Sequence, residues 1–353
     1  MRILSFNVNG IKSYIKFVSK KYSLSFNDFI KNILNTDILC LQETKCNTME
    51  QFNNLKDYEM FYSSNKFRKG YCGVATFVSK SLYCKACIKN FKQADSKYNI
   101  NFCDLEKKEY ISKMFDEGRI IITDHGKFKL LNCYFPYLDN NSADFDSKKE
   151  RIYKFYELIT MLIDENTILC GDLNAVYSIY DHFIYAKEAF RIVSNLRKSS
   201  FSKADKYTEE FPVLERIEKC EYSPTELPFI FKSIAELKKY FFESQQRVWL
   251  KYFLDRNTHM DSFRIYNDNF NCYTCWNTFL GLRLYNLGTR IDYVIIPKCL
   301  NQYIYDAGIM PDIYGSDHCP VYADFNISFD KIEEESNILK RKTNLHLFFN
   351  KLK

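Results

Sequence analysis

The chain has 353 residues, of which 46% are hydrophobic, and its 50 Lys and Arg against 44 Asp and Glu give a formal net charge of +6. This apolar content is enough for a large core, and only 10 Gly and 7 Pro exclude a collagen-like or low-complexity chain. The modest charge permits an anionic partner without requiring one. No apolar run reaches the ~18 residues that a membrane span needs.

The predicted elements follow one another as short apolar strands with helices between them. Strands are predicted at 2–8, 37–42, 73–78, 119–123, 129–134, 167–170, 271–276, 291–296 and 321–325, and helical spacing occurs near 26–33 and over 148–164. Strands rich in β-forming residues with interspersed helices predict an α/β architecture of two packed sheets covered by helices.

Two segments differ from this pattern. Residues 183–250 carry many charges of both signs with helical apolar spacing, which predicts a mostly helical insertion. It is either a solvated packing element or an arm that contacts DNA or a partner. We therefore expect one domain over 1–329 that contains this insertion, followed by a tail over 330–353.

Cysteine is abundant, with 13 residues at irregular spacing. An odd number without a secretory signal predicts free thiols in a reducing compartment. The pairs Cys84/Cys87 and Cys272/Cys275 leave a four-thiolate zinc site as an alternative. Their distance along the chain favours free thiols.

Four polar blocks each follow a predicted strand. They contain Asn7 and Asn9, Glu43, Asp172 and Asn174, and Asp317 and His318. Each block alone is compatible with a simple turn, but catalytic groups usually lie on loops at strand ends of a rigid scaffold. Together they offer what a phosphodiesterase with a hard cation needs: oxygen ligands, a base for water and a donor to the phosphate.

With the residues between them, these blocks resemble the exonuclease III-like apurinic/apyrimidinic (AP) endonucleases of the endonuclease/exonuclease/phosphatase superfamily. The resemblance covers about residues 1–182 and 245–325. It is closest to the AP endonuclease 2 type at 171–174 with 179–182, 261–264, 273–278 and 288–294. It implies a four-layered, DNase I-like α/β sandwich, dependence on Mg²⁺ (with Mn²⁺ as a substitute) and a nuclear role in base excision repair. The implied reactions are cleavage of double-stranded DNA 5′ to abasic sites, 3′–5′ exonuclease activity and 3′-phosphodiesterase activity on damaged ends.

The resemblance also implies roles for individual residues. The expected metal ligands are Glu43, Asn9, Asp172, Asn174, Asp317 and His318. Asp172 is expected to orient or deprotonate the attacking water, and Asn174 to donate to the phosphate. The remaining expected catalytic residues are His318 paired with Asp292, Tyr134 as a phenol donor to the phosphate, and Asn7 as a brace for Asp172.

Substrate contacts are expected at the same rim. Arg68 and Lys69 lie in a glycine-containing loop that suits phosphate contact. Trp276 is expected near a flipped-out baseless sugar, with a place in the core as its alternative, and Arg290 near the DNA backbone.

The tail carries a second motif. Lys342 with Leu345, Phe348 and Phe349 resembles the short segment by which repair proteins bind the sliding DNA clamp, with Lys where Gln is usual. A one-turn helix would present the three apolar side chains to a pocket of the clamp. Packing of the tail on its own domain is the alternative.

Two other functions are compatible with parts of this pattern. One is an inositol polyphosphate or lipid 5-phosphatase of the same superfamily, and the other is a non-catalytic clamp-binding scaffold. Trp276 with the 288–293 block argues against the first, and the intact chemical positions argue against the second. We expect a monomer. The balance of AP endonuclease and exonuclease activity, the number of metals and the role of 183–250 stay open.

Overall fold

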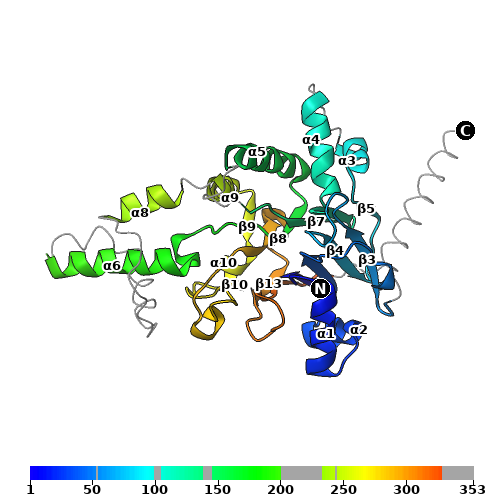
Figure 1. Cartoon of the computed structure of the whole chain (residues 1–353), viewed down its shortest axis with the longest axis horizontal. Helices are drawn as coiled ribbons and strands as arrows, with labels where there is room; N and C mark the ends of the chain where they lie inside the picture. Colours follow the sequence, from blue (N-terminus) through cyan, green and yellow to red (C-terminus); the bar gives the residue numbers. More distant parts are fainter. Residues whose placement is uncertain (53–54, 99–104, 138–144, 200–232, 243–244, 328–353) are drawn as a thin grey trace, which may run out of the picture.

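The computed structural model describes residues 1–52, 55–98, 105–137, 145–199, 233–242 and 245–327. Two six-stranded sheets pack against each other, and helices cover both outer faces (Figure 1). Within the described ranges, none of the helices is long and apolar enough to cross a membrane.

The first sheet brings the two ends of the described chain together. Its order is β13 (Ile304–Ile309), β14 (Val321–Phe325), β1 (Arg2–Asn7), β2 (Ile38–Gln42), β4 (Val74–Ser79) and β3 (Tyr58–Ser63). Strand β1 is parallel to β2 and antiparallel to β14. The amino terminus of Met1 donates to the carbonyl of Phe325 at 2.8 Å, so the first and last strands are neighbours.

The second sheet aligns three candidate residues. Its order is β5 (Ala86–Ile88), β6 (Ile120–Asp124), β7 (Lys129–Tyr134), β8 (Thr167–Asp172), β12 (Asp292–Pro297) and β9 (His259–Asp261). Strand β8 is parallel to β7 and antiparallel to β12, with Asp172 opposite both Tyr134 and Asp292. A separate ribbon pairs β10 (Cys275–Trp276) with β11 (Gly288–Thr289).

The central strands are apolar along their whole length because both faces of each sheet are covered. Successive residues of β8 show this: Ile168 and Cys170 pack between the sheets, whereas Leu169 packs under the outer helices. Side chains alternate between the two faces of a strand, so one run supplies two layers of the core.

Helices complete a four-layered α/β sandwich, as the resemblance implied. The first sheet is covered by α1 (Ile11–Tyr22), α2 (Phe26–Asp28) and the π-helix η1 (Phe29–Leu34). The second is covered by α3 (Phe91–Tyr98), α4 (Leu105–Asp116), α5 (Phe145–Leu162) and α9 (Gln245–Asp255). Shorter elements are η2 (Glu50–Phe52), η3 (Ile179–Asp181), α10 (Ser262–Tyr266), η5 (Leu282–Tyr285) and η6 (Lys298–Leu300).

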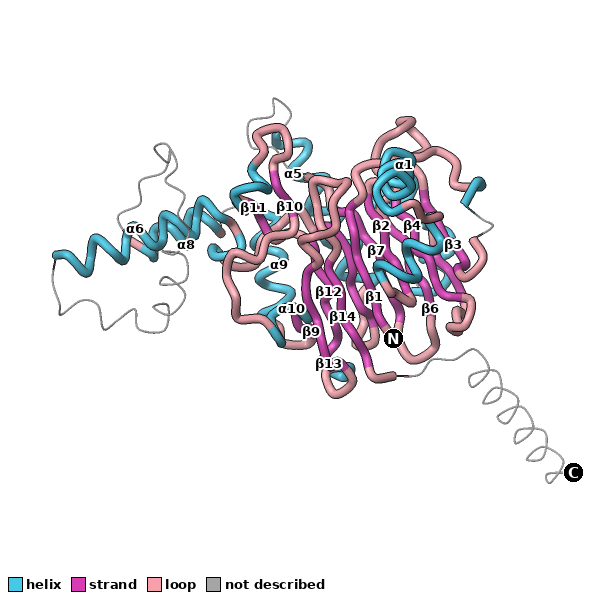
Figure 2. The backbone as a smooth tube through the Cα atoms, turned by 90° about the horizontal axis from the view of Figure 1, so that it is seen from below, coloured by secondary structure: helices cyan, strands magenta, loops and turns pink. Residues whose placement is uncertain are grey.

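The described parts of 183–250 are helical. Helices α6 (Phe183–Ser199) and α8 (Ile234–Phe241) extend away from the sheets (Figures 1 and 2). They share a small cluster of their own, in which Tyr185, Leu237 and Phe241 are buried. Helix α9 instead packs on the second sheet, so this segment contributes to the core as well as projecting from it.

Most predicted strands lie within one or two residues of the observed ones. The predicted strand at 271–276 is wrong in extent, because only Cys275–Trp276 is extended and paired. Strands β3 and β13 were not predicted. All 11 cysteines in the described ranges are free thiols, and the two Cys-x-x-Cys pairs do not meet in a metal-ligand group there. Leu345, Phe348 and Phe349 lie outside the described residues.

Candidate active site

The polar ends of five strands meet at one edge of the two sheets. Asn7 ends β1 opposite Gln42, the last residue of β2, and Glu43 follows directly. Tyr134, Asp172 and Asp292 lie at one level of the second sheet. The loop before β14 adds Asp317 and His318. Strands separated by up to 300 residues of sequence therefore supply one site.

Asn7 joins the two halves of this site. Its buried amide Nδ2 donates to Glu43 Oε1 and to Asp172 Oδ2, each at 2.9 Å. Its Oδ1 accepts from the backbone N–H of Asn9 at 3.0 Å, which fixes the orientation of the amide. A neutral donor thus separates two carboxylates that would otherwise repel each other.

Glu43 lies at the partly exposed rim. Its Oε2 pairs with Lys45 Nζ at 2.8 Å, and the phenol of Tyr134 lies beside the same carboxylate. Burial raises the pKa of Glu43, but the hydrogen bonds from Asn7 and Lys45 outweigh it and hold that pKa below its usual value. Glu43 is therefore ionised at neutral pH and ready to hold a cation.

Asp317 and Asn9 stand beside Glu43. Asn9 Nδ2 donates to Asp317 Oδ1 at 3.0 Å, and Lys45 donates to Asn9 Oδ1. Ser316 Oγ donates to the backbone carbonyl of Asn7 at 2.8 Å, which ties the loop of Asp317 to the end of β1.

His318 lies at the buried base of the site. Its Nδ1 is 2.8 Å from Asp292 Oδ2, and its Nε2 is 3.9 Å from Asp172 Oδ2. Burial lowers the pKa of His318, but the Asp292 carboxylate outweighs it and raises the pKa well above the usual value. The ring is therefore a cation at neutral pH, with Nε2–H directed to the side of Asp172.

The pKa of Asp172 is raised as well, but for a carboxyl group a raised pKa favours the neutral form. Burial, and then the charge of Asp292, raise the pKa of Asp172 to about 7, against the opposing effects of His318 and Asn7. A carboxyl group with that pKa exchanges protons near neutrality, as a general base requires. Asn174 lies two residues on; its N–H donates to Asp172 Oδ1 at 2.9 Å and its Nδ2 to the carbonyl of Phe135 at 2.8 Å.

The donor set fits a hard divalent cation. Ligand atoms of Asp172, Asp292 and His318 lie within 4.8 Å of one another. Asp292 Oδ1 is buried and lacks a hydrogen-bond partner in the structure. However, Asp292 holds the charged ring of His318, whereas the carboxylates of Glu43 and Asp317 are partly exposed and therefore more accessible to a cation. Carboxylate and amide oxygens are the ligands that Mg²⁺ prefers.

The backbone turns sharply at these positions. Asn9, Glu43 and Asn174 have φ of 46°, 48° and 47°, the left-handed region that non-glycine residues rarely adopt. Such conformations gather at functional sites, where the surrounding structure stabilises them. Gly171 is required for another reason: a Cβ there would lie 1.8 Å from the carbonyl oxygen of Cys133. Only glycine lets β8 lie this close to β7 and bring Asp172 beside Tyr134.

Two supporting residues were not predicted from the sequence. Thr274 Oγ1 accepts from the N–H groups of Ile291 and Asp292 at 3.0 and 3.2 Å, which fixes the start of β12. The guanidinium of Arg283 donates to four backbone carbonyls between residues 311 and 318, those of Ser316 and His318 included. Thr274 lies in the 273–278 stretch that carries the resemblance, but its role, like that of Arg283, depends on a segment that is distant along the chain.

The predicted DNA contacts divide into two groups. Arg68 and Lys69 are exposed, as a phosphate contact requires. The prediction for Arg290 is wrong: it is 1% exposed and pairs with Asp181 and Asp261 in the interior. Trp276 is 3% exposed and packs against Tyr273 and Cys319, in agreement with the core alternative.

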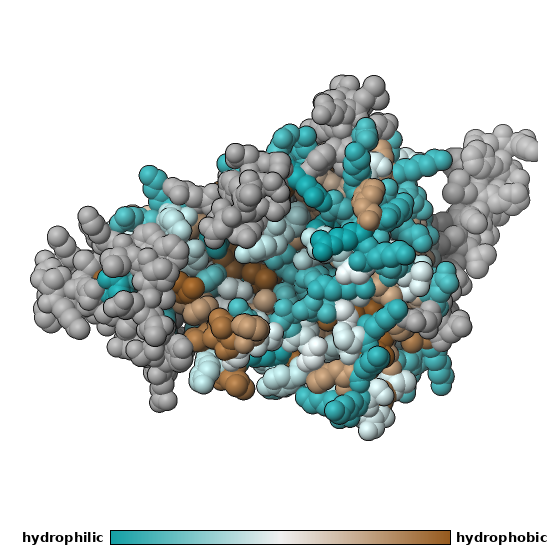
Figure 3. All heavy atoms as spheres, in the orientation of Figure 1, coloured by the Kyte–Doolittle hydropathy of each residue, from teal (hydrophilic) through white to brown (hydrophobic). Residues whose placement is uncertain are grey.

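An apolar loop that was not predicted stands beside the site. Between β10 and β11, Phe279 is 96% exposed and Leu284 is 87% exposed, with Leu280 and Tyr285 also exposed. Figure 3 shows the apolar surface that gathers over this loop. Trp276, at the start of the loop, donates its backbone N–H to the carbonyl of Asp317 at 2.9 Å, so the loop is attached to the site. Exposed apolar side chains of this size mark an interaction surface.

Known proteins with similar sequences indicate the family of this chain. The model of the Endonuclease/Exonuclease/phosphatase family matches residues 4–318. A protein named DNA-(apurinic or apyrimidinic site) endonuclease 2 from Mus musculus is 25% identical over 93% of this chain and 60% of its own length. The Xenopus laevis protein of the same name is 27% identical over 92% and 59%. The chain thus spans about three-fifths of these relatives.

Solved structures of AP endonucleases have a similar fold. The catalytic domain of Xenopus laevis APE2 has a TM-score of 0.65 and 26% identity, covering 92% of each chain. An AP endonuclease from Archaeoglobus fulgidus, at 19% identity, has a TM-score of 0.60 and covers 93% of this chain and 100% of its own, which supports the fold. The sandwich is therefore of the DNase I-like type.

Proposed function

The chain belongs to the endonuclease/exonuclease/phosphatase family, and we propose that it is a Mg²⁺-dependent DNA repair nuclease. Its proposed reaction is hydrolysis of the DNA backbone 5′ to abasic sites, with 3′–5′ exonuclease and 3′-phosphodiesterase activity, in base excision repair. One observation carries the proposal: Asn7 links an ionised Glu43 to Asp172, which faces the Asp292-held cation of His318. The names of the relatives support DNA as the substrate.

Hydrolysis of a phosphodiester requires a nucleophile and stabilisation of negative charge. Asp172, with a pKa of about 7, accepts the proton of the attacking water. His318 donates from Nε2 to a phosphate oxygen, while Asp292 keeps the ring oriented and charged. The second N–H of the Asn174 side-chain amide and the phenol of Tyr134 supply further donors at the same edge.

Glu43 and Asp317 would hold Mg²⁺, and Asn9, Asp172 and Asn174 would offer further oxygen atoms at the same edge. When bound, the ion would neutralise phosphate charge.

Burial, and then the charges of Glu43 and Asp172, raise the pKa of Tyr134 well above its usual value, so its phenol stays protonated as a donor.

Binding of duplex DNA follows from the surface around the site. Arg68 and Lys69 provide phosphate contacts on one side. Phe279 and Leu280 stand on the other side as apolar groups able to insert at a baseless gap in the stack. Neither contact reads base sequence, which suits an enzyme that must act at damage in any sequence.

The test is cleavage of three DNA substrates in Mg²⁺: an internal abasic site, a blocked 3′ end and a mismatched 3′ end. Asp172→Asn is expected to lower kcat at least 1,000-fold, as removal of a general base does, to order of magnitude. Asp255→Asn, on the exposed end of α9, is the matched control. Release of phosphate from inositol polyphosphates, without cleavage of any DNA substrate, would instead support the 5-phosphatase alternative.

We also propose that the tail binds the sliding DNA clamp through Leu345, Phe348 and Phe349, in the nucleus. A peptide of residues 338–353 should bind the clamp in isothermal titration. Phe348→Ala with Phe349→Ala should abolish that binding. Equal affinity of the two peptides would contradict the assignment and leave the nuclease proposal intact.

A further inference from the structure

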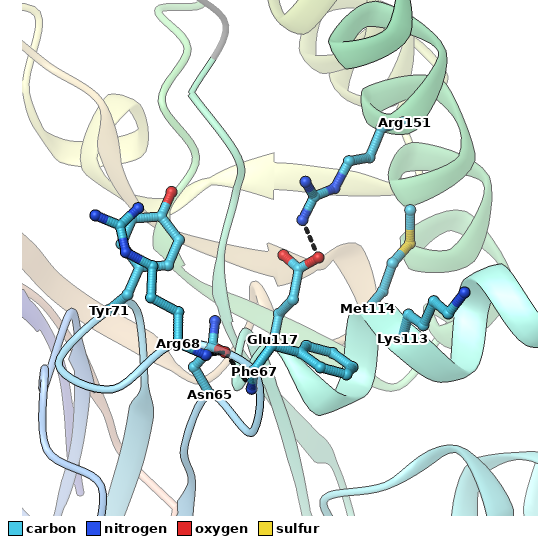
Figure 4. Close-up of a pocket in the computed structure, with 8 residues that line it drawn as sticks. All are labelled: Asn65, Phe67, Arg68, Tyr71, Lys113, Met114, Glu117 and Arg151. Carbon is cyan, nitrogen blue, oxygen red and sulfur yellow. Dashed lines mark hydrogen bonds and ion pairs between the residues drawn. The ribbon is translucent and has the colours of Figure 1, made fainter.

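A pocket of about 620 Å³ lies beside the candidate active site (Figure 4). Phe67, Arg68 and Tyr71 line it from the loop between β3 and β4. Lys113 and Met114 line it from α4, and Arg151 from α5. The pocket is therefore built between the first sheet and the helices that cover the second.

The loop side of the pocket offers aromatic faces. Phe67 is 63% exposed and Tyr71 is 41% exposed, and the guanidinium of Arg68 lies 4.7 Å from the ring centroid of Tyr71. The loop is held in place because Asn65 Oδ1 accepts from the N–H groups of Phe67 and Arg68 at 2.9 and 2.8 Å. The ring of Phe67 is thus displayed before any ligand arrives, at low entropic cost, whereas Arg68 lies over the ring of Tyr71 (Figure 4).

The pocket is also cationic. Glu117, the carboxylate among the described lining residues, is 8% exposed and already bound to Arg119 and Arg151. Lys113 pairs with Glu109 on the same helix, and both side chains are more than half exposed. Such a pair is weak, so a phosphate can replace Glu109. Among the described lining residues, Arg68, Lys113 and Arg151 therefore outnumber the acids and favour an anion.

Arg119 connects the pocket to the site. Its guanidinium carbon lies 4.9 Å from the ring centroid of Tyr134 and 5.9 Å from that of Tyr71. Its Nη1 donates to the carbonyl of Tyr134 at 3.2 Å. One side chain therefore separates the proposed phosphate donor Tyr134 from the pocket, a gap that the next nucleotides of a bound strand would span.

We propose that this pocket binds an unpaired nucleotide of the DNA strand that is being cleaved. The base stacks on the exposed ring of Phe67, and its phosphate lies among Arg68, Lys113 and Arg151. A paired base has both faces covered by its neighbours, so only an unpaired one can stack on a protein ring. This inference rests on the proposed nuclease function, and it makes frayed or gapped DNA the preferred substrate.

The experiment compares two labelled duplexes with the same abasic site. One is fully paired, and the other has two unpaired nucleotides on each side of the site. Fluorescence anisotropy in EDTA measures binding without cleavage, and initial rates in Mg²⁺ measure activity. Wild-type protein should bind the unpaired duplex about fivefold more tightly, the effect expected of one base–aromatic stack.

Phe67→Ala and Lys113→Gln should each remove that preference and leave binding of the paired duplex within about twofold of wild type, because both side chains are exposed. Two variants are matched controls: Tyr252→Ala, an equally exposed ring (63%), and Lys251→Gln, another lysine paired with an acid on its own helix. Both should keep the preference. Equal wild-type affinity for the two duplexes, a preference that survives both pocket variants, or its loss in the controls would overturn the inference.

The two proposals fail separately in this design. If wild-type protein cleaves no DNA substrate in Mg²⁺, the nuclease function is refuted, whatever the binding data show. If it cleaves both duplexes but binds them equally, the pocket has no role in selecting unpaired nucleotides.

Discussion

The replacement Arg290→Gln tests whether this arginine stabilises the fold or contacts DNA. Its Nε and Nη2 each lie 3.0 Å from a carboxylate oxygen of Asp181, and its Nη2 lies 2.7 Å from Asp261 Oδ2. These side chains are 1%, 1% and 6% exposed. Glutamine would leave Asp261 buried without its cation, while Asp181 would keep Arg264. Loss of one member of such a buried pair costs about 3–5 kcal/mol in free energy of unfolding.

Urea denaturation followed by far-UV circular dichroism measures this loss. For a chain of 353 residues, 3–5 kcal/mol corresponds to a fall in Tm of roughly 4–7 °C. Burial raises the pKa of Asp181, but Arg290 and Arg264 outweigh it and hold that pKa below its usual value. A depressed pKa gives stability that is present at neutral pH and lost as the pH falls. The difference between variant and wild type should therefore shrink on acidification.

Adding Asp261→Asn to Arg290→Gln should restore part of the stability, because it removes the unpaired charge. Arg256→Gln, at an exposed arginine, is the control and should change the free energy of unfolding by less than about 0.5 kcal/mol. A fall of under 1 kcal/mol together with a large loss of affinity for abasic DNA would refute this reasoning and restore Arg290 as a DNA contact.

Three further predictions address catalysis. Asn7→Ala removes the donor that favours ionised Asp172, so the acid limb of the plot of kcat/KM against pH should move up by about one pH unit. Asn267→Ala is the control. A fall in kcat/KM without a shift of this limb would contradict the prediction. Asp292→Asn removes the carboxylate that raises the pKa of His318, so the alkaline limb of the same pH profile should move to lower pH. At pH 8, kcat/KM should fall about 100-fold. An alkaline limb that does not move would exclude a charged His318 from the reaction. EDTA should abolish cleavage and Mg²⁺ should restore it, with Mn²⁺ as a substitute; full activity in EDTA would exclude a metal at Glu43.

The strand-end blocks were predictable because their signal is local. An apolar run followed at once by Asn7, Glu43 or Asp172 shows a buried strand and its polar end within a few residues. Strands β3 and β13 lie at sheet edges, where partly exposed positions interrupt the apolar pattern. The hydrophobic pattern on which the prediction depends is absent there.

Arg290 and Phe279 show the limit of such reasoning. A single arginine is expected at the surface until its acids are known, and Asp181 lies 109 residues away. A phenylalanine is expected in the core, yet Phe279 is 96% exposed. In both cases the outcome depends on contacts between distant segments, which periodicity along the chain does not record.

The pairing of β1 with β14 means that the candidate site is completed late in synthesis. Asn9, which follows β1, leaves the ribosome early, but its partner Asp317, just before β14, follows more than 300 residues later. At about 5–20 residues per second, that interval is roughly 15–60 s. A nascent or prematurely terminated chain that lacks β14 and the loop before it therefore has an incomplete candidate site, and the proposed hydrolysis could begin only after the sheet has received its last strands.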